Sequence, residues 1–175
     1  MAIKQSEQKQ IATDLVIVGG GIGGLVLALL AARRHLSVLV LDQGPGPTTN
    51  PVPTVIGPMG LALLDEIGLL ASLAEEDVYP CDVFHFYAIG GEKLLDADYR
   101  LVDLPSLRGL TNLIISSFIL QSLLVRELSH KENVSLLWGG QLNSLIFDEG
   151  VVCGVTFRHE GTTVTAKARL TVGAD

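Results

Sequence analysis

The stretch "DLVIVGGGIGGLVLALLAARRHLSVLVLDQ", residues 14–43, holds five glycines within six positions, between two apolar runs. No charged residue occurs from Leu15 to Ala32, a length of 18 residues that could cross a bilayer as a helix. Each glycine, however, costs a helix about 1 kcal/mol relative to alanine. The glycines therefore predict a turn between separate elements rather than a membrane span.

The residues on either side of the glycines have the composition of a strand, a helix and a second strand. Residues 14–18 are short, apolar and β-branched, as in a strand that is buried on both faces. Residues 22–34 are rich in Leu and Ala and predict a helix, and residues 37–41 predict a second buried strand. The stretch is thus expected to form a βαβ unit of about 30 residues.

The glycines of this unit match the pattern GxGxxG at Gly19, Gly21 and Gly24. Gly19 permits the tight turn, Gly21 leaves room for a pyrophosphate beside the backbone, and Gly24 lets the helix pack closely on the strand. The start of the helix offers N–H groups and a positive dipole end to the phosphates. Asp42 ends the second strand, where its carboxylate can accept hydrogen bonds from the ribose hydroxyls of an adenosine. We therefore predict a dinucleotide site that prefers FAD or NAD to NADP.

The whole chain of 175 residues is acidic and apolar, with a net charge of -7 and a hydrophobic content of 48%. This balance argues against disorder and against nucleic acid as a partner. Cys81 and Cys153 lie far apart and outside any CxxC pattern, and the histidines show no metal-ligand spacing, so we expect ordinary thiols and no metal. The polar start of the chain lacks a signal-peptide pattern. We expect a cytoplasmic protein with no transmembrane segment.

The rest of the chain bears on the choice between FAD and NAD. A simple NAD domain would place a third parallel strand close after residue 42, but residues 44–58 predict a long proline-rich loop. The following patterns predict a helix over 58–76, a β-hairpin around Gly90 and Gly91, a helix over 117–130, and several short antiparallel strands over 134–172. An NAD-dependent Rossmann dehydrogenase stays open as the alternative.

This order of motifs resembles the N-terminal part of the FAD-dependent monooxygenases of the para-hydroxybenzoate hydroxylase type. Beside residues 14–43, the similar segments are "GPMGLALLDEIGLL" (57–70), "FILQSLLVREL" (118–128), "LLWGGQLNSLIFDEGVVCGVTF" (136–157) and the closing "LTVGAD" (170–175). The resemblance implies an α/β fold: a Rossmann-like FAD/NAD(P)-binding domain, in which a parallel sheet with helices is joined by an antiparallel β-meander. The resemblance also implies that the chain contains the start of a substrate-side β-hairpin.

The same resemblance implies which residues hold the FAD. Gly19, Gly21 and Gly24 would hold the pyrophosphate. Asp42 would bind the adenosine ribose with Gln43 beside it, Gln121 would lie near the pyrophosphate and ribityl chain, Leu142 would contact the adenine through its backbone, and Asp175 would be the Asp of an Asp-Gly motif. No catalytic residue can be singled out. Two departures from the family pattern are His35, which replaces the usual glycine at the helix end, and the lack of a clear counterpart for the arginine of the following loop.

The resemblance also implies a division of the chain and an activity. Residues 1–13 would be a polar tail, 14–78 the FAD-binding βαβ core and a helix, 79–112 a partial substrate-side β insertion, and 113–175 the remainder of the FAD-binding domain, truncated at the Asp-Gly motif. Such an enzyme uses NAD(P)H and O2 to hydroxylate or epoxidise an apolar or aromatic small molecule. We expect the chain to be less than half of such an enzyme. Its expected partner is either the missing C-terminal half or further copies of the chain in a homo-oligomer. A truncated, non-catalytic nucleotide-binding chain that needs a partner stays open.

Overall fold

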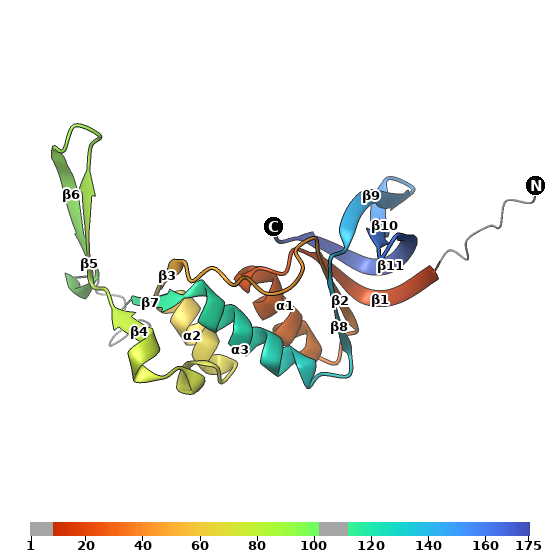
Figure 1. Ribbon diagram of the computed structural model, residues 1–175, viewed down its shortest axis with the longest axis horizontal. Helices are drawn as coiled ribbons and strands as arrows, with labels where there is room; N and C mark the ends of the chain where they lie inside the picture. The colour runs from red at the N-terminus through yellow and green to blue at the C-terminus, as the bar shows by residue number, and fades with distance from the viewer. Residues whose placement is uncertain (1–8, 102–111) are drawn as a thin grey trace, which may run out of the picture. The chain divides into compact units, whose positions relative to one another are not determined.

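The computed structural model describes residues 9–101 and 112–175 (Figure 1). The described residues form two compact units. Unit 1 consists of residues 9–49 and 121–175, and unit 2 consists of residues 50–101 and 112–120. These bounds differ from the expected division, which placed boundaries after residues 78 and 112. Residues 50–78 instead group with the later residues of unit 2.

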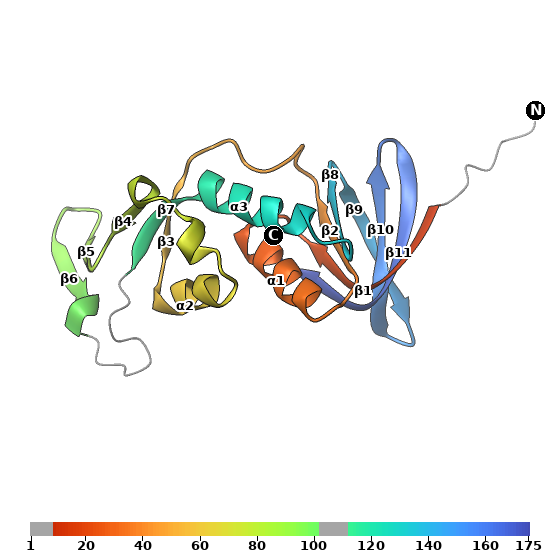
Figure 2. The same ribbon diagram turned by 90° about the horizontal axis from the view of Figure 1, so that it is seen from below.

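Unit 1 is built on a six-stranded sheet with the order β8-β2-β1-β11-β10-β9 (Figure 2). The strands are β1 (Lys9–Val18), β2 (Val38–Asp42), β8 (Val134–Trp138), β9 (Gln141–Asp148), β10 (Val151–His159) and β11 (Thr162–Gly173). The neighbours β8, β2, β1 and β11 are all parallel, whereas β11, β10 and β9 form an antiparallel meander. The predicted combination of a parallel sheet with a meander is therefore confirmed.

The two faces of β1 are covered by different layers. Helix α1 (Ile22–Arg33) packs on β1 and β2, and Gly24 of this helix lies against the Ile17 side chain. Val16 faces the other way, into a core shared with the meander. This core consists of Val16, Leu39, Leu41, Val155, Phe157, Val164 and Ala166. Burial on both faces explains the unbroken apolar runs of β1 and β2.

The prediction of a polar tail through residue 13 is wrong for residues 9–13, because β1 already begins at Lys9. These residues pair in parallel with β11, with Lys9 opposite Val164 and Ile11 opposite Ala166. Lys9, Gln10 and Ala12 are exposed while Ile11 packs against the core. With one large apolar residue and no alternation of polar and apolar residues, this part of the strand gives no signal in the sequence. The long β1 and β11 thus extend from the parallel part of the sheet into the meander.

The strands after residue 134 also differ in part from the prediction. We expected antiparallel strands throughout, but β8 runs parallel to β2, with Val38 opposite Val134. The turns expected near residues 148–150 and 160–161 are present. Each has two central residues with positive φ, Glu149 and Gly150 in one turn and Glu160 and Gly161 in the other, as two-residue hairpins require.

Unit 2 contains a small antiparallel sheet, a helix and a hairpin. The sheet has the order β3-β7-β4, formed by β3 (Pro53–Ile56), β7 (Leu113–Ser116) and β4 (Val78–Pro80). The proline-rich loop therefore contains a strand that we did not predict. Helix α2 (Pro58–Glu66) ends earlier than expected, because Gly68 has a positive φ of 74° and single 3-10 turns follow at Leu70–Ser72 and Glu75–Asp77. Helix α3 (Ser117–Ser129) begins in unit 2 and belongs to unit 1 from residue 121 onward.

The predicted hairpin around Gly90 and Gly91 is confirmed. Strands β5 (Val83–Tyr87) and β6 (Lys93–Asp98) pair antiparallel, and a single 3-10 turn follows at Tyr99–Leu101. The next strand after β2 is β3, which belongs to the separate antiparallel sheet. Within residues 43–101, all of which the structure describes, there is therefore no third parallel strand of the kind that the NAD alternative requires.

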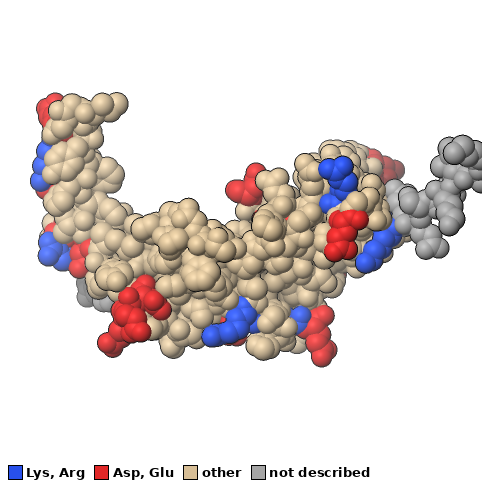
Figure 3. Space-filling model, viewed as in Figure 1, with Lys and Arg blue, Asp and Glu red and all other residues tan. Residues whose placement is uncertain are grey.

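The surface of the described residues carries both signs of charge. On the face drawn in Figure 3, Lys and Arg side chains lie in small groups among Asp and Glu side chains. Within residues 9–101 and 112–175, no helix combines the length and the apolar character needed to span a bilayer.

Candidate functional site

Two glycines of the GxGxxG pattern are required by the backbone of the protein itself. Gly19 follows β1 with a positive φ of 122°, and a Cβ at this position would overlap the Ala174 carbonyl group. A Cβ at Gly24 would overlap the carbonyl oxygen of Gly19. The roles predicted for these two residues, a tight turn and close packing of helix on strand, agree with their contacts.

Gly21 differs from both of these glycines. Its backbone is extended, with φ −69° and ψ 177°, and the nearest atom to an added Cβ would be the Ala174 carbonyl oxygen at 3.9 Å. A Cβ would therefore fit at this position without strain. Gly21 is also the N-cap of α1, none of the described side chains caps this helix end, and the first turn contains no acidic residue. The positive end of the helix dipole is thus left available for an anion.

Gly20, which the motif leaves unspecified, is held on three sides. Its N–H donates to Oδ2 of Asp42 at 2.6 Å, and its carbonyl oxygen accepts a hydrogen bond from Nε2 of Gln121 at 2.6 Å. A Cβ on Gly20 would lie 2.7 Å from the ring of Trp138. The peptide groups of the turn are therefore fixed by neighbours from β2, α3 and β8.

Asp42 joins the glycine turn to the loop that follows β2. Its Oδ2 accepts the hydrogen bond from Gly20, and its Oδ1 accepts a hydrogen bond from the Gly44 N–H at 2.7 Å. An ionised carboxylate has about four lone-pair sites, so two backbone donors leave capacity for two more. The side chain is half-buried at the end of β2. Asp42 can therefore hold its orientation and still accept hydrogen bonds from a ligand.

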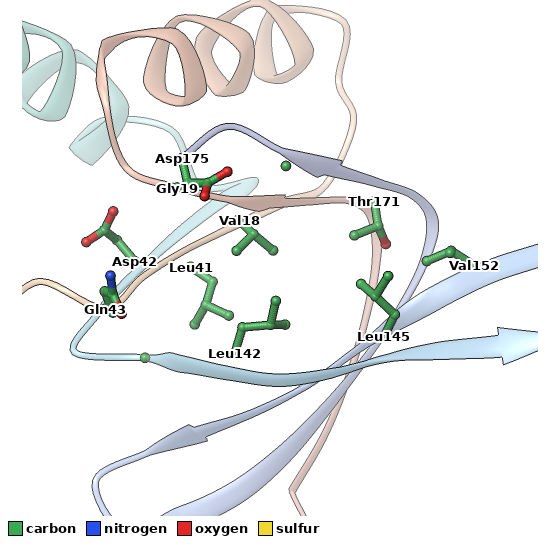
Figure 4. A pocket seen from close by; sticks show the side chains of 12 residues that line it. Val18, Gly19, Leu41, Asp42, Gln43, Leu142, Leu145, Val152, Thr171 and Asp175 are labelled. Atoms are coloured by element: carbon green, nitrogen blue, oxygen red, sulfur yellow. The ribbon is translucent and has the colours of Figure 1, made fainter.

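A cavity of about 430 Å³ lies beside the glycine turn, between the ends of the parallel strands and the meander (Figure 4). Gly19, Asp42, Gln43 and Asp175 line one end of it, and further apolar side chains line the middle and the other end. These apolar residues are Val18, Leu41, Leu142, Leu145 and Val152. One end can therefore receive a polar group, while the remainder suits a flat apolar ring.

Gln121 lies on the other side of the Gly20 peptide and is almost fully buried, with 7% of its surface exposed. Its Oε1 accepts a hydrogen bond from the Thr48 N–H at 2.5 Å, while its Nε2 donates to Gly20. Gln121 is not among the residues that line the cavity. The structure thus brings all eight predicted residues to the turn or the cavity, but places Gln121 against the backbone.

Trp138, Gly140 and Thr171 belong to the same region and were missed by the sequence analysis. Trp138 is the register partner of Asp42, Gly140 and Thr171 line the cavity, and a Cβ on Gly140 would collide with the Leu41 side chain. The parallel pairing of β8 with β2 places Trp138 and Gly140 there. Because we expected antiparallel strands after residue 134, no sequence signal pointed to them.

A separate charged cluster lies on the hairpin of unit 2. Asp96 accepts from the ring nitrogen Nδ1 of His85 at 2.5 Å and pairs with the Lys93 ammonium group at 2.6 Å. The hydrogen bonds from His85 and then from Lys93 hold the pKa of Asp96 below its ordinary value. All three side chains are about half exposed. The cluster is therefore an exposed surface network.

Comparison with known proteins settles the family of the chain. Residues 12–175 match the family described as the FAD binding domain. The chain belongs to this family. The expected resemblance to FAD-dependent monooxygenases of the para-hydroxybenzoate hydroxylase type, and FAD as the cofactor of the domain, are thereby confirmed.

Curated relatives of the chain include monooxygenases and epoxidases. It is 31% identical over 166 residues to 6-methylpretetramide 4-monooxygenase of Streptomyces rimosus, covering 93% of this chain and 38% of the relative. It is 32% identical over 175 residues to squalene epoxidase 6 of Arabidopsis thaliana, covering 97% of this chain and 32% of the relative. The chain therefore spans roughly a third of the length of the curated relatives that it matches.

A solved structure supports the fold. The crystal structure of p-nitrophenol 4-monooxygenase PnpA from Pseudomonas putida DLL-E4 superposes with a TM-score of 0.74 at 23% identity, covering 96% of this chain and 42% of PnpA. At this identity the likeness concerns the fold alone. The predicted Rossmann-like FAD/NAD(P)-binding fold is confirmed by it.

Proposed function

We propose that the chain is the FAD-binding part of a flavin-dependent monooxygenase, and that the FAD diphosphate binds at the glycine turn with the adenosine in the adjoining cavity. The observation that carries this proposal is the environment of Gly21. The contacts within the protein explain the glycines at positions 19 and 24, but they leave room for a Cβ at position 21. A ligand that approaches the backbone closely at Gly21 explains why glycine occurs there.

The charge and polarity of the site support this placement. The uncapped N-terminus of α1 presents N–H groups and a positive dipole end, which favour a diphosphate. Asp42 retains acceptor capacity for the ribose hydroxyls, and Gln43 lies beside it in the cavity. The apolar wall near Leu142 suits an adenine ring, whose edge the backbone of β9 would contact. Asp175 would lie near the diphosphate end of the same cavity.

The chemistry itself comes from the cofactor. Bound flavin supplies electron transfer from NAD(P)H to O2 and oxygen insertion into an apolar or aromatic small molecule, the classes that relatives named for squalene and para-nitrophenol suggest. The residues of this chain bind and orient the adenosine and diphosphate. The same proposal includes contacts between this chain and further domains of such an enzyme, or association of the chain into a homo-oligomer.

FAD binding by the purified chain tests the proposal. We expect saturable binding with one FAD per chain, competition by ADP, and a flavin absorbance spectrum that changes on binding. Anaerobic mixing of the flavin-loaded protein with NADH or NADPH tests the reductant, and loss of the flavin absorbance band marks reduction. A protein that leaves the FAD spectrum and fluorescence unchanged at saturating concentrations contradicts the proposal.

A further inference from the structure

Gln121 connects two segments of the site without lining the cavity. We propose that Gln121 is a positioning residue, which holds the glycine turn in the shape that receives a diphosphate and ties this turn to the loop after β2. The inference rests on the proposed FAD function. It adds to the role expected from the sequence, in which Gln121 would contact the cofactor.

The two hydrogen bonds of Gln121 fix the orientation of its amide group. Oε1 faces the Thr48 N–H, a donor, and Nε2 faces the Gly20 carbonyl, an acceptor. A rotated amide would place the amide nitrogen against the N–H and the amide oxygen against the carbonyl oxygen, so both hydrogen bonds would be lost. This orientation is therefore the one that satisfies both backbone groups.

The hydrogen bond to Gly20 determines the direction of the next peptide N–H. The Gly20 carbonyl and the Gly21 N–H belong to one trans peptide group, so they point in opposite directions. With the carbonyl held toward Gln121, the Gly21 N–H points away from α3. Asp42 holds the preceding N–H, and the Trp138 ring packs beside the Gly20 α-carbon. The turn is thus preorganised before any ligand binds.

Burial keeps the Gln121 amide group in this orientation. Its side chain is 7% exposed, its oxygen uses one of two acceptor sites, and its nitrogen uses one of two N–H donors. Turning the amide toward a cofactor would leave Thr48 N–H and Gly20 carbonyl without these partners. Losing both hydrogen bonds would cost more than one hydrogen bond with a ligand returns. Gln121 therefore keeps its hydrogen bonds to the backbone when a cofactor binds, and acts on the cofactor through the glycine turn.

The test compares three ligands that differ in what they present to the turn. FAD and ADP carry a diphosphate, and adenosine lacks one. We expect Gln121→Leu and Gln121→Glu to bind FAD and ADP roughly tenfold more weakly than the wild type, because both variants lack the hydrogen bond to the Gly20 carbonyl. A tenfold change corresponds to about 1.4 kcal/mol, which is typical of one lost buried hydrogen bond. The affinity for adenosine should stay within about twofold of the wild type. Gln10→Leu and Gln10→Glu, at an exposed glutamine of β1, are the matched controls and should bind all three ligands like the wild type.

A second measurement reports the hydrogen bond itself without any ligand. Amide hydrogen exchange at Thr48 should accelerate in Gln121→Leu, which has no acceptor, and remain slow in Gln121→Glu, which keeps one. Gln121→Glu also keeps the proposal testable if the leucine variant does not fold. Unchanged exchange at Thr48 in Gln121→Leu overturns the inference.

The ligand series separates failure of this inference from failure of the proposed function. A wild-type chain that binds neither FAD nor ADP overturns both. A wild-type chain that binds both ligands, with unchanged affinities in the two variants, overturns the role of Gln121 alone. An equal loss of affinity for adenosine and for ADP also overturns it, because this pattern indicates a general loss of structure.

Discussion

The ring of Trp138 packs against the α-carbon of Gly20, so closely that an added Cβ would lie 2.7 Å from it. Trp138 ends β8, and it reaches the glycine turn because β8 pairs in parallel with β2. The GxGxxG pattern leaves position 20 unspecified, but this contact makes glycine necessary there. The identity of one residue in the turn is thus determined by a strand more than a hundred positions later.

A double-mutant cycle tests this contact. We expect Gly20→Ala to lower the free energy of unfolding by about 1–3 kcal/mol, the usual cost of overpacking. In the Trp138→Leu background the same change should cost clearly less, because the ring that obstructs the methyl group is gone. Urea denaturation of the four proteins measures the coupling. Strict additivity of the two changes would show that the ring does not restrict position 20.

Adjacent glycines at the start of α1 should respond oppositely to alanine. At Gly24 an added Cβ would overlap the Gly19 carbonyl oxygen, whereas at Gly23 it would meet no described atom within 4 Å outside the adjacent residues and the backbone of α1. Gly24→Ala should therefore destabilise the chain by roughly 2 kcal/mol or more. Gly23→Ala should stabilise it by up to about 1 kcal/mol, since alanine favours the helix. Thermal and urea unfolding of the two variants provide the comparison, and equal effects at both positions would refute the packing argument.

The end of α1 carries a strained residue that glycine would relieve. His35 has a positive φ of 60°, its N–H donates to the Ala32 carbonyl, and the Leu36 N–H donates to the Ala31 carbonyl. These bonds form a Schellman motif, in which glycine is the preferred residue at the position of His35. We expect His35→Gly to raise the free energy of unfolding by about 1 kcal/mol. His35→Ala keeps the Cβ and is the control; a similar gain from alanine would show that strain is not the cause.

Asp14 makes the stability of unit 1 depend on pH in the acid range. The Ser37 backbone N–H and then the Ser37 hydroxyl donate to its carboxylate, which lowers the pKa of Asp14 below its ordinary value of 3.8. Because the unfolded chain binds this proton more readily, the contribution of Asp14 is complete above pH 3.8 and is lost as the pH falls through the lower folded-state pKa.

Asp14→Asn should therefore be less stable than the wild type near neutral pH, and the difference should shrink as the pH falls below about 4. Ser37→Ala should have a smaller effect, because its backbone N–H still donates to the carboxylate. Urea unfolding at several pH values measures both variants. A difference between Asp14→Asn and the wild type that is constant from pH 7 to below pH 3 would contradict the assignment.

The sequence predicts the parts of the site that lie close together along the chain. The strand, the glycine turn, α1, β2 and Asp42 occupy one local unit whose periodicity and spacing are visible in residues 14–43. Trp138 could not be placed in the same way, because its position depends on how β8 pairs with β2. The first half of β1, residues 9–13, gave no signal because Ile11 is its one large apolar residue. The burial of Gln121 depends on the packing of α3, which no local pattern specifies.

The central claim is that glycine at position 21 serves a ligand and not the protein fold. Gly21→Ala should lower the free energy of unfolding by no more than about 1 kcal/mol, the usual difference between glycine and alanine at an N-cap. The same variant should bind FAD at least about tenfold more weakly than the wild type, because the Cβ occupies the space beside the backbone. Gly90→Ala, at an open position of the unit 2 hairpin, is the matched control.

The decisive measurement is an FAD titration of Gly21→Ala beside the wild type, with the unfolding free energy of each protein measured in parallel. Our account predicts nearly unchanged stability together with a large loss of FAD affinity. Wild-type affinity in Gly21→Ala, or a loss of affinity that merely follows a loss of folding, would contradict it.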